Sequence, residues 1–176
     1  MTSPRRAPEP SRAPVRGKSL SGRIDGGARG NPGPAGIGVV LEEEGGARDE
    51  YYAFLGTATN NVAEYTALLV LAVLSLERGA AELTIHSDSE LLVKQMEGTY
   101  RVRNPKLQIL HAAARRLLAR IPRVTLRHVP REENRDADRL ANRAMDERGS
   151  SGPLPGEVMA LVGSGEQGAF SYGEGV

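Results

Sequence analysis

Three short stretches in the first third of the chain carry apolar residues at strand-like spacing, and glycine or charged residues separate them. They span residues 20–25, 37–41 and 51–55. The first ends at Gly26-Gly27, and a polar turn at residues 43–49 joins the other two. We therefore predict that the fold begins with a meander of three β-strands.

The rest of the chain alternates between helix-like and strand-like patterns. A strongly apolar stretch at residues 62–76 predicts a long helix, and Asn104-Pro105 opens another that runs to about residue 119. The remaining elements are a strand at residues 83–86, a helix at 89–96, a strand at 124–129 and a helix at about 134–147. The order βββαβααβα predicts an α/β fold, in which a five-stranded mixed sheet carries helices on both faces.

The two ends of the chain have little to bury. Residues 1–18 hold four prolines and five Lys or Arg against the single acid Glu9, which predicts a disordered basic tail. From residue 149 to 176, glycine recurs and positive charge vanishes, which predicts a flexible glycine-rich tail. A short apolar run at residues 158–162 is the one part of this tail that we consider able to dock. One folded domain is therefore expected at residues 19–148.

Composition narrows the classes of function. The net charge of +1 provides no global attraction to nucleic acid, so any affinity must come from local patches. The absence of cysteine excludes disulfides, thiolate zinc sites and thiol nucleophiles. No stretch approaches 18 apolar residues, and the N-terminus has no apolar run typical of a secretory signal. We expect a cytoplasmic monomer without a membrane partner.

Four acidic residues stand at predicted strand ends or helix starts, where side chains can converge. They are Asp25, Glu64, Asp88 and Asp138. Four convergent carboxylates repel one another and cannot all ionise without a counter-charge. A pair of hard divalent cations supplies that charge, and two-metal sites cut phosphodiesters. The pattern therefore predicts a metal-dependent nuclease.

Each acid taken alone also has an ordinary structural explanation. Asp25 precedes two glycines, as a turn aspartate does. Glu64 can close a capping box that begins at Asn61, and Asp88 can be a first-turn acid in a helix capped by Ser87. Residue patterns alone leave these alternatives open.

The last helix offers two candidate acids. At about 100° per residue, Asp136 and Asp138 fall on opposite edges of the apolar face of this helix. The helical wheel does not choose between them.

Taken together, four segments resemble type 1 ribonuclease H, in the order found in that family. They are IDGGARGNPGPAG, TNNVAEYTAL, IHSDSELL and HVPREENRDADRLANRA, and the resemblance covers about residues 20–147. It implies an enzyme that cleaves the RNA strand of RNA–DNA hybrids and leaves 5′-phosphate and 3′-hydroxyl ends. It also implies that Asp25, Glu64, Asp88 and Asp138 hold two Mg²⁺ or Mn²⁺ ions. The family motif A-D-x-L-A selects Asp138 over Asp136.

The resemblance further implies residues that contact substrate or assist the reaction. His128, ten residues before Asp138, matches a histidine thought to assist proton transfer or product release. A plain structural histidine also fits this position at a strand end. Thr59 matches a position that helps to hold a DNA phosphate, and Glu90 stands where some members have glutamine. The positions near the RNA strand are Asn31, Asn60 and Asn61.

Two features bear on substrate preference. A basic group that flanks the expected site can bind phosphates, and it comprises Lys94, Arg101, Arg103 and Lys106. The chain is too short in this region for the basic insertion of some family members. The alternatives to hybrid cleavage are cleavage of double-stranded RNA as a second activity, and a catalytically silent nucleic-acid-binding module. A resolvase or transposase relative fits the first two segments poorly.

Overall fold

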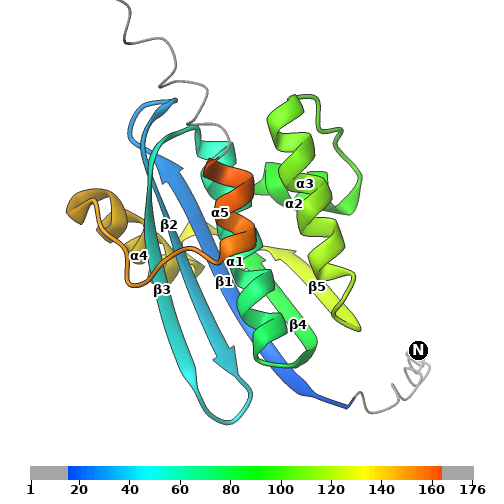
Figure 1. The fold of residues 1–176 in the computed structure, drawn as a ribbon. Coiled ribbons are helices and arrows are strands. Elements are labelled where there is room, and N and C mark those ends of the chain that lie inside the picture. Colours follow the sequence, from blue (N-terminus) through cyan, green and yellow to red (C-terminus); the bar gives the residue numbers. More distant parts are fainter. Residues whose placement is uncertain (1–15, 164–176) are drawn as a thin grey trace, which may run out of the picture.

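Five strands form one mixed sheet in the computed structural model, which describes residues 16–163 (Figure 1). The strands are β1 (Lys18–Ala28), β2 (Gly33–Glu43), β3 (Arg48–Ala58), β4 (Ala80–Ser87) and β5 (Arg123–His128). Their order across the sheet is β3-β2-β1-β4-β5. β1, β2 and β3 pair antiparallel, whereas β4 pairs parallel with both β1 and β5. The predicted five-stranded mixed sheet is confirmed.

Helices cover both faces of this sheet. The helices are α1 (Asn60–Glu77), α2 (Glu90–Glu97), α3 (Pro105–Leu118), α4 (Arg135–Glu147) and α5 (Gly156–Val162), with a 3-10 turn η1 (Arg131–Glu133) before α4. α1 packs against β1 and β2 on one face, with α3 and α5 outside it, and α4 packs on the opposite face (Figure 1). The predicted order is confirmed, and α5 is added to it.

The long helix α1 is apolar on nearly all sides because it lies between the sheet and other helices. Twelve of its 18 residues are buried. Leu68, Leu69 and Leu71 are fully buried in the main hydrophobic core. Truncation of one such leucine to alanine costs about 2–5 kcal/mol of stability. α1 is thus a rigid support for any polar group that it carries.

Glycines allow α4 to lie directly on β2. A Cβ atom on Gly38 would clash with the carbonyl oxygen of Ala137, and one on Gly36 would stand 2.8 Å from that of Ala141. Both glycines therefore let the backbone of the helix approach the backbone of the strand. This close packing places the first turn of α4 beside β1.

The C-terminal stretch differs from our expectation of a flexible tail from residue 149. The backbone N–H of Phe54 donates to the carbonyl oxygen of Gly149 at 3.1 Å, and that of Ser151 donates to Tyr52 at 2.9 Å. β3 is an edge strand with free backbone groups, so even a polar segment can pair with it. The apolar run at residues 158–162 does dock, because Val158 of α5 is fully buried. The expected tail segments 1–15 and 164–176 lie outside the described residues.

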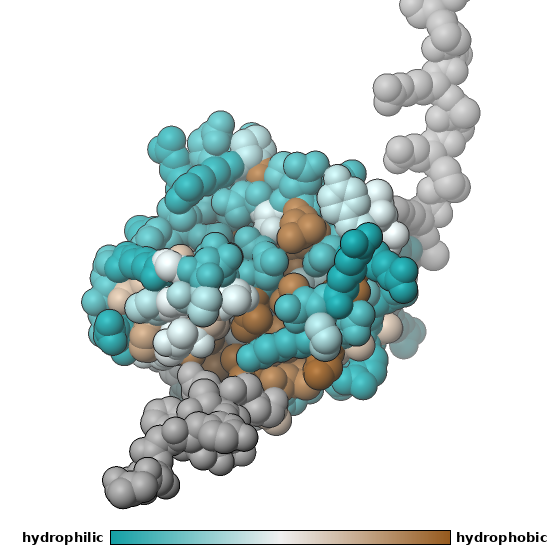
Figure 2. Space-filling model, turned by 90° about the horizontal axis from the view of Figure 1, so that it is seen from above, coloured by the Kyte–Doolittle hydropathy of each residue, from teal (hydrophilic) through white to brown (hydrophobic). Residues whose placement is uncertain are grey.

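Surface character adds two observations. Seen from above, the molecule is mainly hydrophilic, and hydrophobic residues gather toward the lower right of the view (Figure 2). The large hydrophobic side chains that are exposed within residues 16–163 are Leu91, Tyr100, Ile109 and Met159. No helix in this range is long and apolar enough to cross a membrane.

Candidate active site

The four predicted acids come from four different elements and line one cavity of about 460 Å³. Asp25 lies on β1, Glu64 in α1, Asp88 just after β4, and Asp138 in α4. The other residues that line the cavity are Gly26, Gly27, Ala28, Arg29, Asn60, Arg131, Asn142 and Met145. Residues 113 positions apart in the chain therefore meet at one point, as the sequence pattern predicted.

Gly26 brings the first two acids together. A Cβ atom at this position would clash with the backbone of Ala63, so β1 and α1 touch directly here. Because side chains alternate along a strand, Asp25 points away from this contact and toward the face that carries α4. Glu64 follows Ala63 in the helix, and its carboxyl reaches the same cavity.

Glu64 is not part of a capping box. The N-cap of α1 is Thr59, whose Oγ1 accepts from the backbone N–H of Val62 at 3.2 Å. The helix starts before Asn61, so Glu64 lies beyond the capping positions. Its Oε2 instead accepts a hydrogen bond from Ser89 Oγ at 2.8 Å. The capping alternative for Glu64 is wrong.

Asp88 precedes its helix rather than lying within the first turn. The N-cap of α2 is Ser89, which accepts from the backbone N–H of Leu92 at 3.2 Å, and not Ser87. Ser87 Oγ accepts from the N–H of Ser89 at 3.1 Å and tightens the turn. Asp88 therefore stands at the carboxyl end of a parallel strand, where open α/β sheets place their ligands.

The structure separates the two acids of α4. Asp138 lines the cavity, whereas Asp136 Oδ2 accepts a hydrogen bond from Arg48 Nη2 at 2.7 Å outside it. The Arg48 guanidinium lowers the pKa of Asp136.

Asn134 links α4 to β1. Its side chain is fully buried, and its Nδ2 donates to the carbonyl oxygen of Ile24 at 2.8 Å. The backbone N–H of Asp138 donates to the carbonyl oxygen of Asn134 at 3.1 Å. Asn134 thereby fixes the strand that carries Asp25 relative to the helical turn that carries Asp138.

Burial and repulsion between carboxylates raise the pKa values of Asp25, Glu64 and Asp88. Burial, then the Asp88 and Asp138 carboxylates, raise the pKa of Asp25 to about 8. Burial raises the pKa of Glu64 to about 7, against the opposing hydrogen bond from Ser89. Burial also raises the pKa of Asp88, although the nearby Arg131 opposes this. The cavity thus concentrates carboxyl groups whose ionisation requires added positive charge.

The donor set of the cavity fits a hard divalent cation. All four acids offer carboxylate oxygens, which Mg²⁺ and Mn²⁺ prefer. Within residues 16–163, no three His, Asp or Glu side chains are already gathered as a preformed metal cluster. Two of the acids have other partners instead, because Glu64 accepts from Ser89, and Asp138 lies 3.4 Å from Arg131.

Comparisons with known proteins agree with this arrangement. A family model described as reverse transcriptase-like matches residues 23–144. Ribonuclease HI of Halobacterium salinarum is 38% identical over 135 residues, which are 76% of this chain and 68% of that protein. The chain belongs to the type 1 ribonuclease H family.

Two further proteins with ribonuclease H structures share the fold of this chain. A bifunctional protein of Mycobacterium tuberculosis is 40% identical over 140 residues, 78% of this chain, and the chain spans 38% of its length. The structure of its N-terminal ribonuclease H domain, fused to maltose-binding protein, has a TM-score of 0.71 at 41% identity, covering 74% of this chain and 95% of that one. A ribonuclease H1 from compost, in complex with an RNA/DNA hybrid, has a TM-score of 0.68 at 42% identity, covering 74% and 99%.

Of the five residues predicted to contact substrate, only Asn60 lines the cavity, and Asn31 is hydrogen-bonded to Asn60. Asn60 lines the cavity, and its Oδ1 accepts from the backbone N–H of Ala28 at 2.7 Å. Asn31 Oδ1 accepts from the N–H of Asn60 at 3.1 Å. Both bonds use the amide oxygen, so the NH₂ groups are the parts left for a ligand. Thr59, Asn61 and Glu90 are not among the residues that line the cavity.

Arg131, which precedes α4, lines the cavity but was not among the site residues predicted from the sequence. The predicted residue in the same region is His128. His128 is exposed at the end of β5, and its Nε2 lies 3.3 Å from the carbonyl oxygen of Asp88. His128 does not line the cavity, whereas Arg131 does and approaches Asp138. The signal for Arg131 is its place in the PREEN segment, between His128 and the acid of α4. The predicted role of His128 stays a prediction.

Proposed function

We propose that this chain is a metal-dependent endoribonuclease that cleaves the RNA strand of RNA–DNA hybrids and leaves 5′-phosphate and 3′-hydroxyl ends. The observation that carries the proposal is the convergence of Asp25, Glu64, Asp88 and Asp138 on one cavity. Family membership supports it, as does the related ribonuclease H1 whose structure contains an RNA/DNA hybrid.

The four carboxylates would hold two Mg²⁺ or Mn²⁺ ions. When bound, such ions would supply a nucleophilic hydroxide and would stabilise charge on the leaving 3′ oxygen. Asp25 and Glu64 are more deeply buried than Asp88. Ser89 holds the Glu64 carboxyl, and Asn134 sets the spacing of β1 and α4.

Amide groups at the cavity edge suit recognition of the RNA strand. The 2′-hydroxyl is both a donor and an acceptor, and it distinguishes RNA from DNA. The NH₂ group of Asn60 lies beside the acids, and Asn31 is bonded to the same turn. Arg131 adds a positive charge at the cavity, where charge develops on a phosphate under attack.

One assay tests the proposal directly. Labelled RNA–DNA, RNA–RNA, DNA–DNA and single-stranded RNA are offered with Mg²⁺, with Mn²⁺ and with EDTA. We expect cleavage of the RNA strand of the hybrid with either metal and none in EDTA. Robust cleavage in EDTA, or none of the hybrid with either metal, would sink the proposal. Cleavage of RNA–RNA beside the hybrid would identify the second activity.

A further inference from the structure

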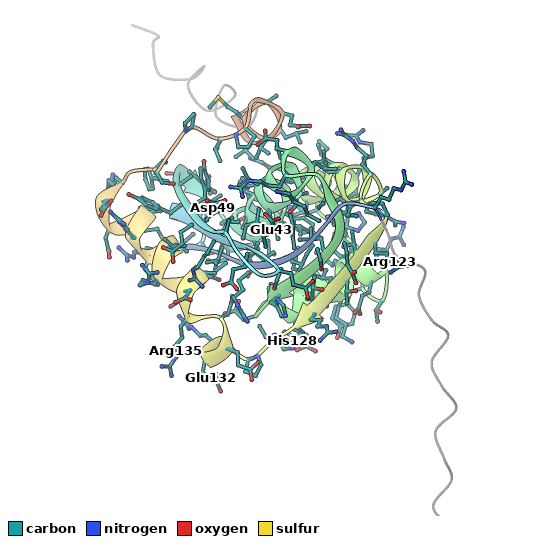
Figure 3. All side chains as sticks on the ribbon, turned by 90° about the horizontal axis from the view of Figure 1, so that it is seen from below. Glu43, Asp49, Arg123, His128, Glu132 and Arg135 are labelled. Atoms are coloured by element: carbon teal, nitrogen blue, oxygen red, sulfur yellow. The ribbon has the colours of Figure 1, made fainter. Side chains whose placement is uncertain are left out.

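Within residues 16–163, no helix covers one half of the sheet face that carries α4. α4 packs against β1, β2 and β3, whereas the packing of α2 on β4 and β5 is on the other face. Figure 3 shows the His128 end of β5 near Glu132 of η1 and near Arg135, where α4 begins. On this open part of the face, Thr125 and Arg127 are exposed. The open face adjoins the cavity, because Asp25 belongs to the same face of β1.

Arg23 and Arg127 are two cations in a row of three side chains across the open face, and His86 lies between them. Arg23 on β1 pairs in register with His86 on β4, and His86 pairs with Arg127 on β5. Neighbouring strands are about 4.8 Å apart, so the three side chains emerge side by side. Arg23 lies two residues before Asp25 on the same face of β1, a distance of about 7 Å along the strand. This cation row is therefore the rung next to the acids.

Local contacts with the backbone position two members of the row. Arg23 Nη1 donates to the carbonyl oxygen of Glu133 at 2.8 Å, and His86 Nδ1 lies 3.1 Å from the carbonyl oxygen of Gly22. Both partners are backbone groups that carry no net charge. Arg127 has no carboxylate partner among the side chains that the structure describes. Arg127 thus keeps its guanidinium donors and its positive charge for a ligand.

Beyond the cation row, farther from the cavity, the open face forms a hollow of about 520 Å³. Ser21, Thr84 and Thr125 pair in register and form a rung of hydroxyl groups. Acidic side chains close the far end of the hollow, and two of them are already paired: Glu42 with Arg48 and Glu43 with Lys18. Among the residues that line the hollow, the basic side chains of His86 and Arg127 lie at the end nearest the cavity.

We propose that the cation row binds a backbone phosphate of the nucleic acid next to the one that is cleaved. The proposal rests on the proposed function, since it extends the substrate path from the cavity onto the open face. Every nucleotide carries one phosphate, so a substrate held at Asp25 brings further phosphates within reach of a row about 7 Å away. Arginine and hydroxyl donors suit phosphate oxygens and read no base, so this contact is independent of sequence.

The test compares Arg127→Gln, and the double change His86→Gln with Arg127→Gln, against a matched control. The control is Arg120→Gln, which removes the same charge from an exposed position beyond α3. Binding of a fluorescent RNA–DNA hybrid is measured in EDTA at several salt concentrations. We expect the double change to raise Kd about tenfold and the slope of log Kd against log salt to fall by about one. Arg120→Gln should change neither quantity.

Cleavage with Mg²⁺ supplies an independent readout. The cation-row variants should raise KM and leave the single-turnover rate at saturating hybrid unchanged. A second hybrid ends at the cleavage position, so that it lacks the neighbouring phosphate that the cation row would bind. The variants and the parent should bind this shortened hybrid equally. Kd and salt slope equal to those of the parent would overturn the proposal, as would an equal loss in Arg120→Gln. If His86→Gln fails to fold, exposed Arg127→Gln alone decides the outcome. A parent that binds hybrid but never cleaves it would instead defeat the proposed function.

Discussion

At the scale of single residues, the site is defined by what each acid touches rather than by its place in the sequence. Asp136 and Asp138 differ by two positions in one helix, yet Asp136 is bound to Arg48 and Asp138 faces the cavity. Glu64 and Asp88 likewise acquire their places from Thr59 and Ser89, which start the two helices.

Replacement of these two aspartates by asparagine should have opposite outcomes. Asp138→Asn should abolish hybrid cleavage, because it removes a carboxylate from the cavity. Asp136→Asn should retain most activity, because an exposed ion pair contributes little to stability. Single-turnover cleavage of a labelled hybrid with Mg²⁺ measures both. The reverse pattern would show that α4 presents the other acid.

Arg131 and His128 can be ranked in the same assay. Arg131→Gln removes a positive charge that lines the cavity and should slow cleavage at saturating substrate by about tenfold or more. His128→Gln should have the smaller effect, because His128 lies outside the cavity lining. A larger loss in His128→Gln would assign the proton transfer or product release step to the histidine.

At the scale of elements, the position of α4 depends on Gly36 and Gly38, because the helix lies so close to β2 that a side chain would not fit there. Gly38→Ala should destabilise the protein by about 1–3 kcal/mol, because the added Cβ meets the carbonyl oxygen of Ala137. Gly46→Ala is the matched control, since nothing lies within 4 Å of a Cβ at that position. Urea unfolding of both variants measures the difference. Equal stability would show that α4 shifts without cost.

Sequence patterns predicted the elements because most of them bury one apolar face, but backbone pairing leaves no such pattern. β2 begins at Gly33, earlier than the apolar run predicted, because Gly33 pairs with Ala58 through the backbone. Residues 149–151 escaped prediction for the same reason. The convergence of the acids was predictable from strand ends and helix starts. The choice of Ser89 over Ser87 as N-cap was not, because both serines suit that role.

At the scale of the whole molecule, the acids link activity to stability. The pKa of Asp25 is raised from 3.8 to about 8 and that of Glu64 from 4.5 to about 7. Between these limits the unfolded chain has released protons that the folded protein retains. The free energy of unfolding without metal should therefore fall as pH rises from about 4 to about 8.

Thermal unfolding at pH 5 and pH 8, in EDTA and with millimolar Mg²⁺, measures this dependence. Metal should raise the melting temperature more at pH 8, because cations compete with protons for the carboxylates. Asp88→Asn should be at least as stable as the parent in EDTA and should gain less from metal. A clear loss of stability in EDTA, with an equal gain from metal, would make Asp88 a structural acid.

The pairing of residues 149–151 with β3 has a consequence for how the protein behaves at high concentration. An uncovered edge strand is a template for a second chain, and this edge presents Tyr52 and Phe54. The match to the family model ends at residue 144, so this protection against self-association belongs to a stretch beyond the matched residues. A chain ending at residue 148 should form concentration-dependent oligomers, which light scattering would detect. One ending at residue 163 should not, and Val158→Ala controls for the loss of α5. The solubility of the protein would then depend on residues 149–151, which the sequence analysis assigned to a flexible tail.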